Sequence, residues 1–227
     1  MEFLLVFVVT VAAALALREP LKRCPVAFYA LACAVVFVFL AGANGLLSGG
    51  WWKPSIVLVQ RCMVALSLFS VVMLIGALPK GSKLDAWLRP VRAELSIVAC
   101  ILCLGHMCMY LAPYAARAVA GTMGAPMLVS FVVAVVLFVL VLVLGVTSFG
   151  FVKKRMGGRA WKNVQRLAYP FFGLAWVHLM FMLAPAASKG GEQALLSVVI
   201  YTVLFSVYIV LRLFRAYRDK RAGLSSA

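Results

Sequence analysis

Acidic side chains are scarce in this chain. Of its 227 residues, 6 are Asp or Glu against 22 Lys or Arg, and only 12% are charged. An ordinary soluble domain is about a quarter charged, so the composition excludes a typical soluble enzyme or binding domain. It also excludes a disordered chain, which is poor in apolar residues, because 66% of this sequence is hydrophobic. An integral membrane protein remains.

Polar residues interrupt the apolar parts of the sequence at only a few places. Seven apolar runs approach or reach the roughly 17 to 25 residues that a membrane-spanning helix needs. They are residues 3–17, 26–47, 55–78, 95–114, 127–149, 167–184 and 194–211. A signal peptide is positively charged before its apolar run, whereas the first run has Glu2 before it and Arg18 after it. We therefore predict an all-α fold, a polytopic transmembrane bundle of seven helices.

The basic residues predict the orientation. Eighteen of the 22 lie in the connections after the first, third and fifth helices and in the C-terminal tail, while the opposite connections hold Lys53, Arg117 and Lys189. Basic loops gather on the cytoplasmic side, which places the N-terminus outside and the C-terminus in the cytoplasm, in a cell membrane. Anionic lipid then explains the net charge of +16. No base-stacking motif accompanies it, so we expect no nucleic-acid partner.

The sequence contains two histidines, His106 and His178, and both lie inside predicted spans. They follow the basic boundaries at Arg92 and Gln165 by 14 and 13 residues. At 1.5 Å per residue, both imidazoles are expected about 20 Å from these inner boundaries, in the outer half of the bilayer. Such a pair suits the iron of a b-type haem held inside a helical bundle. The alternatives are a purely structural role, in which each histidine hydrogen-bonds a carbonyl in the bundle, or zinc, which prefers four ligands.

The surroundings of the histidines also suit a haem. Small residues on the helix of His106 would let a flat macrocycle approach the backbone, and aromatic residues near His178 would form apolar walls. These residues are Ser96, Cys100 and Cys103 on the first helix and Phe171, Phe172 and Trp176 on the second. Because two axial histidines leave no open position on the iron, such a site favours electron transfer over oxygen chemistry. We expect the cysteines themselves to serve core packing.

Two stretches carry a resemblance. Residues 92–106 (RAELSIVACILCLGH) form one, and the second combines Thr147-Ser148, Lys154-Arg155-Met156-Gly157, Trp161 and Gln165-Arg166-Leu167-Ala168-Tyr169 with His178. They resemble the third core helix and the fourth-to-fifth helix region of the MsrQ/YedZ haem proteins, members of the ferric-reductase-like transmembrane group. The resemblance implies a six-helix haem-binding core at residues 25–216. Residues 1–24 would be an extra N-terminal helix, and residues 217–227 a short basic cytoplasmic tail.

The resemblance also has departures. In two-haem relatives the inner haem would take its ligands at the positions of Arg92 and Gln165, and neither residue is a usual haem ligand, whereas the outer pair, His106 and His178, is intact. The resemblance therefore implies one haem b near the outer face. It further implies that electrons pass from quinol or a reduced flavin, with FMN or quinone as a further cofactor, to an extracytoplasmic redox protein. In the best-known relatives that protein is a methionine sulfoxide reductase.

Three further residues are candidates for cofactor binding. Arg61 lies inside the third span, where it would bind a haem propionate or else reach the headgroups or a carbonyl. Gln165 and Arg166 end a strongly basic loop, residues 151–166, which would bind anionic lipid or else receive a flavin or an acidic reductase. No nucleotide-binding fingerprint follows any strand, so we expect the donor to be a quinol or a separate protein.

The predicted function is therefore a haem b electron-transfer subunit. Two other functions use the same residues differently. A direct transmembrane ferric reductase would need the same haem, whereas a haem-free transporter or scaffold would use the histidines for proton transfer or packing. The sequence lacks the paired broken helices that are typical of transporters.

Overall fold

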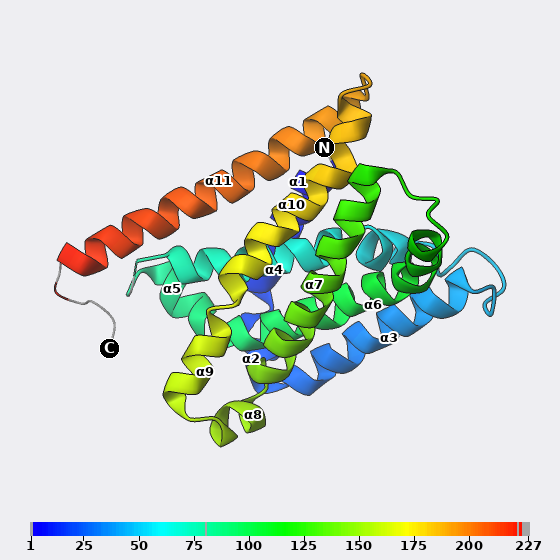
Figure 1. Cartoon of the computed structure of the whole chain (residues 1–227). Helices are drawn as coiled ribbons and strands as arrows, with labels where there is room; N and C mark the ends of the chain where they lie inside the picture. Colours follow the sequence, from blue (N-terminus) through cyan, green and yellow to red (C-terminus); the bar gives the residue numbers. More distant parts are fainter. Residues whose placement is uncertain (1, 80, 222, 224–227) are drawn as a thin grey trace.

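The protein is an all-α bundle in the computed structural model, which describes residues 2–79, 81–221 and 223 (Figure 1). These residues contain no strand, so the predicted fold class is confirmed. Five helices are long and apolar enough to cross a membrane, and two shorter apolar helices accompany them. Together they support the prediction of a multi-pass membrane protein.

The predicted apolar runs correspond to seven helices. These are α1 (Glu2–Ala16), α3 (Pro25–Ala43), α4 (Met63–Ala77), α6 (Arg92–Val119), α7 (Ala125–Ser148), α10 (Ala168–Ala187) and α11 (Glu192–Arg221). The shorter two are α1 and α4, with 15 residues each. The last helix continues well past residue 211, where we expected it to end, so part of the predicted tail is helical.

The third span is not continuous, and our prediction of one helix over residues 55–78 is wrong. A π-helical turn, η1 (Ile56–Gln60), is followed by a bend at Arg61 and Cys62, and α4 begins only at Met63. Cys62 adopts a left-handed conformation with φ of 54°, which ends the helical ladder. The break is invisible in the apolar pattern because residues on both sides of it are apolar.

Helix α6 lies at the centre of the bundle, packed against α3, α4 and α7, while α10 packs between α7 and α11 (Figure 1). The core contains fully buried residues of α3, η1, α4 and α6, among them Phe39, Val59, Ala65 and Ala99. A second cluster joins α4, α10 and α11, and in it the rings of Phe172 in α10 and Phe205 in α11 stack with centroids 4.2 Å apart. Apolar residues on the outer helix faces are exposed, as expected for a protein that contacts lipid.

Five short helices contain most of the basic connections. They are α2 (Arg18–Arg23), α5 (Lys83–Leu88), η2 (Arg89–Val91), α8 (Gly150–Arg155) and α9 (Gly158–Gln165). We call the region that they and the last turns of α11 occupy the basic end of the bundle. The predicted cytoplasmic connections thus form compact helices, not open loops.

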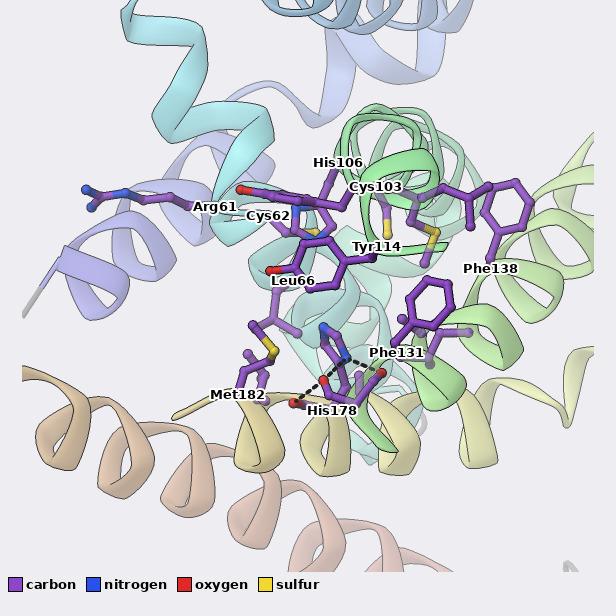
Figure 2. Close-up of a pocket in the computed structure, with 18 of the residues that line it drawn as sticks. Arg61, Cys62, Leu66, Cys103, His106, Tyr114, Phe131, Phe138, His178 and Met182 are labelled. Carbon is purple, nitrogen blue, oxygen red and sulfur yellow. Dashed lines mark hydrogen bonds between the residues drawn. The ribbon is translucent and has the colours of Figure 1, made fainter. Parts of the chain in front are cut away.

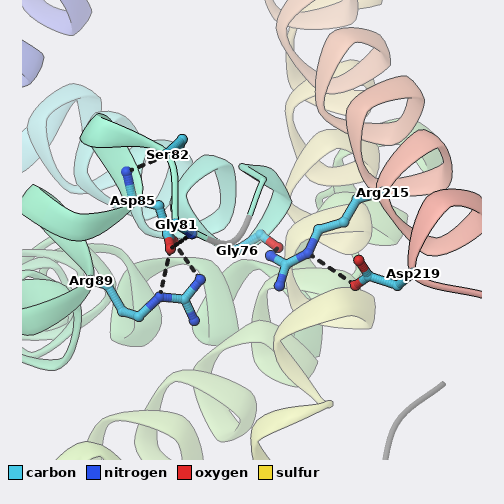
Figure 3. Close-up of polar contacts among 7 residues, drawn as sticks. All are labelled: Gly76, Gly81, Ser82, Asp85, Arg89, Arg215 and Asp219. Carbon is cyan, nitrogen blue, oxygen red and sulfur yellow. Dashed lines mark hydrogen bonds and ion pairs between the residues drawn. The ribbon is translucent and has the colours of Figure 1, made fainter. Parts of the chain in front are cut away.

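Side-chain contacts close the basic end (Figure 3). Asp85 accepts hydrogen bonds from the Arg89 guanidinium and, at 3.3 Å, from the backbone N–H of Gly81. Arg215, which is buried, donates to the carbonyl of Gly76 and pairs with Asp219. Gly76 belongs to the last turn of α4, where carbonyls have no partner within the helix. Arg215 therefore ties α11 to the end of α4.

Candidate functional site

Both histidines line one cavity of about 570 Å³ (Figure 2). Residues of η1, the bend after it, α4, α6, α7 and α10 form its walls, together with Tyr201 of α11. The walls are mainly apolar and include the rings of Phe69, Phe131, Phe138 and Phe171. This volume falls within the range of roughly 300–1,000 Å³ that is typical of cofactor and small-molecule sites. The expectation that the two histidines share one site agrees with this arrangement.

His106 is held by the backbone of the broken third span. Its Nδ1 atom lies 2.6 Å from the carbonyl oxygen of Gln60. A carbonyl can only accept, so Nδ1 carries the proton and Nε2 keeps its lone pair. Within the described part of the chain, Nε2 has no hydrogen-bond partner. The ring also packs against Tyr110, with centroids 5.0 Å apart.

His178 is held in the same way by α7. Its Nδ1 atom lies 3.1 Å from the carbonyl oxygen of Ser130 and 2.9 Å from the Ser130 hydroxyl. That hydroxyl lies 3.4 Å from the carbonyl oxygen of His178, to which it donates. Ser130 is fully buried, so the contact is fixed by the packing of α7 on α10. The two histidines therefore present the same tautomer, with Nε2 available.

This arrangement is the usual one for metal-binding histidines, which donate their other ring N–H to a carbonyl or carboxylate. The number of protein ligands in the cavity discriminates between a zinc site and a haem site. No group of three or more His, Cys, Asp or Glu within residues 2–79, 81–221 and 223 could hold a metal ion. A zinc site would need about four such ligands, whereas a haem brings four nitrogens of its own and needs two axial imidazoles. The cavity residues fit a haem.

The predicted pocket walls are only partly correct. Cys103 and Phe171 line the cavity, whereas Ser96, Cys100, Phe172 and Trp176 do not. Cys100 packs against Gly145 of α7, Phe172 stacks on Phe205, and Trp176 lies 3.3 Å from Thr202, to which it donates. Helical spacing identified the face of each helix but not the neighbour that the face meets.

Arg61 lies at the rim of the cavity, and its guanidinium extends away from the histidines (Figure 2). It forms an ion pair with Glu2 at the start of α1, and half of its side chain is exposed. The partners expected from the sequence were a haem propionate, a headgroup or a carbonyl, and Glu2 was not among them. Gln60 and Ser130, which position the two histidines, were not expected either.

Gln165 and Arg166 lie outside the cavity, at the basic end. The side-chain amide of Gln165 donates to the Thr147 hydroxyl at 2.9 Å, and the Trp161 indole donates to the Thr147 carbonyl at 2.9 Å. Arg166 lies 3.4 Å from Asn163, to which it donates. At the other inner position, the Arg92 guanidinium lies against Gly76. By the resemblance to two-haem relatives, an inner haem would need imidazoles at these two positions, and the side chains present do not fit that group.

Comparison with known proteins identifies a family. Residues 61–176, about half of the chain, match the family model described as ferric reductase like transmembrane component. The match includes His106 and ends two residues before His178. An uncharacterized protein of Treponema pallidum (strain Nichols) is 36% identical over 212 residues, which are 92% of this chain and 58% of that protein. The chain thus spans less than two thirds of this relative. No solved structure matches.

Proposed function

The chain belongs to the family of ferric reductase-like transmembrane components, and from this premise we propose that it is a haem b electron-transfer protein. The family supports a redox role across a membrane. The observation that carries the finer proposal is the matched presentation of His106 and His178. Both face one cavity from different helices, and each donates Nδ1–H to a backbone carbonyl. Both Nε2 atoms are left to bind iron.

In this proposal a bound haem b supplies a one-electron couple. His106 and His178 would hold its iron, and the carbonyls of Gln60 and Ser130 fix the two imidazoles in the required tautomer. The apolar walls exclude water and thereby influence the potential at which the site accepts an electron. Because two histidines would hold the iron, the group would supply electron transfer and not oxygen chemistry.

The proposed orientation follows the charge of the connections. The basic end faces the cytoplasm, the N-terminus lies outside, and the histidine cavity lies in the outer half of a cell membrane. The acceptor is an extracytoplasmic redox protein, and an MsrQ-like system with a methionine sulfoxide reductase is the specific proposal. Because Arg92 and Gln165 provide no inner haem, the donor is a membrane quinol that reaches the site from the lipid, or a reduced flavin at the basic end near Arg166.

A visible absorption spectrum of the detergent-purified protein tests the proposal. We expect sharp bands after dithionite reduction and one haem per chain by pyridine haemochrome. Both His106→Ala and His178→Ala should lose the haem, whereas Gln165→Ala should retain it. A colourless protein from haem-replete cells would overturn the proposal and leave a transporter or scaffold. Two haems per chain would contradict the single site.

A second candidate is direct reduction of extracellular ferric iron, which the description of the matching family favours. It requires the same haem, so the two functions differ only in the acceptor. Proteoliposomes that contain the protein, a quinol and an external ferric chelate separate them. Chelate reduction without any other protein supports the ferric reductase, and its absence supports an acceptor protein.

A further inference from the structure

The break in the third span leaves one carbonyl free. In a continuous α-helix, the carbonyl of Gln60 would accept from the N–H four residues later. Here the backbone turns left-handed at Cys62, the first bond of α4 runs from the N–H of Leu66 to the carbonyl of Cys62 at 2.9 Å, and no backbone N–H among the described residues bonds to the carbonyl of Gln60. His106 Nδ1 is the partner that the described residues give to the Gln60 carbonyl. The break and the histidine contact are therefore one feature.

The break has an unusual conformation for its sequence. Cys62 is the one residue other than glycine with positive φ in the described part of the chain. A side chain there clashes with the backbone, so such a conformation persists only where the surroundings impose it. Strained residues of this kind are concentrated at functional sites. The carbonyl of Gln60, two residues before Cys62, has no helical partner and points at His106. This contact is a specific reason for the strain.

Gln60 contacts α6 at two points. Besides the carbonyl bond to His106, its side-chain amide donates to the Tyr110 hydroxyl at 3.1 Å. Residues 106 and 110 are four apart and lie on the same face of α6. Two bonds from one residue to this face fix both the position and the rotation of the helix that carries the histidine.

Gly105 allows η1 to come this close. A Cβ atom at residue 105 would lie 2.8 Å from a methyl group of Val59 in η1 and 2.8 Å from one of Val36 in α3. Real Cβ contacts are longer than this, and a buried valine has little freedom to move. Only glycine at residue 105 is compatible with the observed distance between η1 and α6, and hence with the 2.6 Å contact to His106.

The bend after η1 is also held by a contact on the side that faces away from the cavity. Arg61 follows Gln60, points away from the cavity and pairs with Glu2 of α1 (Figure 2). The first helix thus contacts the break directly, in addition to packing along α4. The extra N-terminal helix supports the segment that positions His106.

We propose that Gln60 is a positioning residue for the cavity, and that Gly105 and the Glu2–Arg61 pair serve this role. Gln60 keeps the proton of His106 on Nδ1 and directs Nε2 into the cavity. For the haem itself this inference rests on the proposed function. Partners of this type affect metal affinity by about 10- to 100-fold. Disturbing the break should therefore measurably weaken the binding of haem by the cavity.

The test compares two glycines in transmembrane helices. Gly105→Ala should push η1 away from α6, whereas Gly173→Ala in α10 places a methyl group in open space. Titration of haem-depleted protein with haemin should give a dissociation constant about 10- to 100-fold higher for Gly105→Ala and unchanged for Gly173→Ala. Equal haemin affinities for the two variants, together with an unchanged tautomer of His106, would overturn the proposal.

A second measurement needs no haem. Nitrogen-15 NMR of histidine-labelled protein without haem reports which ring nitrogen carries the proton. The wild type should show His106 protonated at Nδ1, and Gly105→Ala should show a mixture of tautomers. If the wild type binds no haem but the NMR result holds, the proposed function fails and the positioning role stands. If haem binds but Gly105→Ala has no effect in either measurement, the positioning role fails alone.

A milder variant covers the case in which Gly105→Ala does not fold. Tyr110→Phe keeps the ring and removes the acceptor of the Gln60 amide. We expect a several-fold weaker affinity for haemin and a changed His106 nitrogen signal. The control is Tyr217→Phe on the exposed part of α11. Identical results for these two variants would contradict the two-point contact.

Discussion

The histidine cavity and the basic end place polar groups inside the same bundle in opposite ways. In the cavity, each imidazole uses one nitrogen for a contact with the protein and keeps the other available. At the basic end the polar groups contact one another, as in the bonds of Arg215 to Gly76 and of Gln165 to Thr147. A buried polar group without a partner is unfavourable. Available nitrogens in a cavity therefore indicate a ligand, whereas a closed network indicates structural support.

The largest expected effect is at the cavity. Replacing His178 with Ala removes one of the two proposed haem ligands and should abolish haem binding at micromolar haem. The protein should still fold, because Ser130 retains its place in the packing of α7 on α10. The pyridine haemochrome of the purified variant measures the loss, and its helical circular dichroism gives the control. Retention of a full haem with an unchanged spectrum would contradict the assignment of His178.

A stability effect without a spectral effect is expected at the basic end. Arg215→Gln removes a charged donor from the Gly76 carbonyl and from Asp219. Bonds to charged groups contribute about 1.5–3 kcal/mol, so unfolding in detergent should become easier by about 2 kcal/mol. The exposed Arg218 offers a matched control, Arg218→Gln. A changed haem spectrum in Arg215→Gln would mean that the two regions are coupled.

A smaller effect is expected from Ser130→Ala. The variant loses the hydroxyl that lies 2.9 Å from His178 but keeps the backbone carbonyl at 3.1 Å. Loss of one of the two contacts should weaken haem binding by about tenfold, the lower end of the range for such partners. Ser197→Ala in α11 is the control, because that hydroxyl bonds only within its own helix. Haemin titration distinguishes the variants.

The smallest effect is expected from Gln165→Ala. It removes a neutral hydrogen bond to Thr147, which contributes about 1 kcal/mol. Haem content should stay at one per chain, and the unfolding midpoint in detergent should fall slightly. A loss of haem from this variant would place Gln165 in the cofactor site and remove the contrast between the two ends.

The helices were largely predictable from the sequence, but the contacts between them were not. Apolar runs and basic boundaries located all seven apolar helices to within a few residues at most ends. The break at Cys62 was missed because Ile, Val and Leu continue the apolar pattern up to Gln60. Gly105, directly before His106, was a signal that could have been used, since small residues mark close helix approach in membranes.

The two histidines were identifiable because ionisable residues inside spans are rare. Their partners were not. The carbonyls of Gln60 and Ser130 belong to the backbone, which every residue has, so nothing in the sequence marks them. Glu2 was known as a charge before the first span, but only the folded arrangement brings it to Arg61. Such contacts depend on which helices are neighbours in the fold. The local pattern of apolar and charged residues in the sequence does not contain that information.

The length of α1 has a consequence for the membrane itself. This helix has 15 residues, or about 22 Å, and it packs side by side with α4. The hydrocarbon layer is about 30 Å thick, and a bilayer thins around a hydrophobic segment that is too short for it. Lipid beside this flank should therefore be locally thin. Water would then approach the rim at Arg61, and in the proposed function this would shorten the distance between the cavity and an acceptor protein in solution.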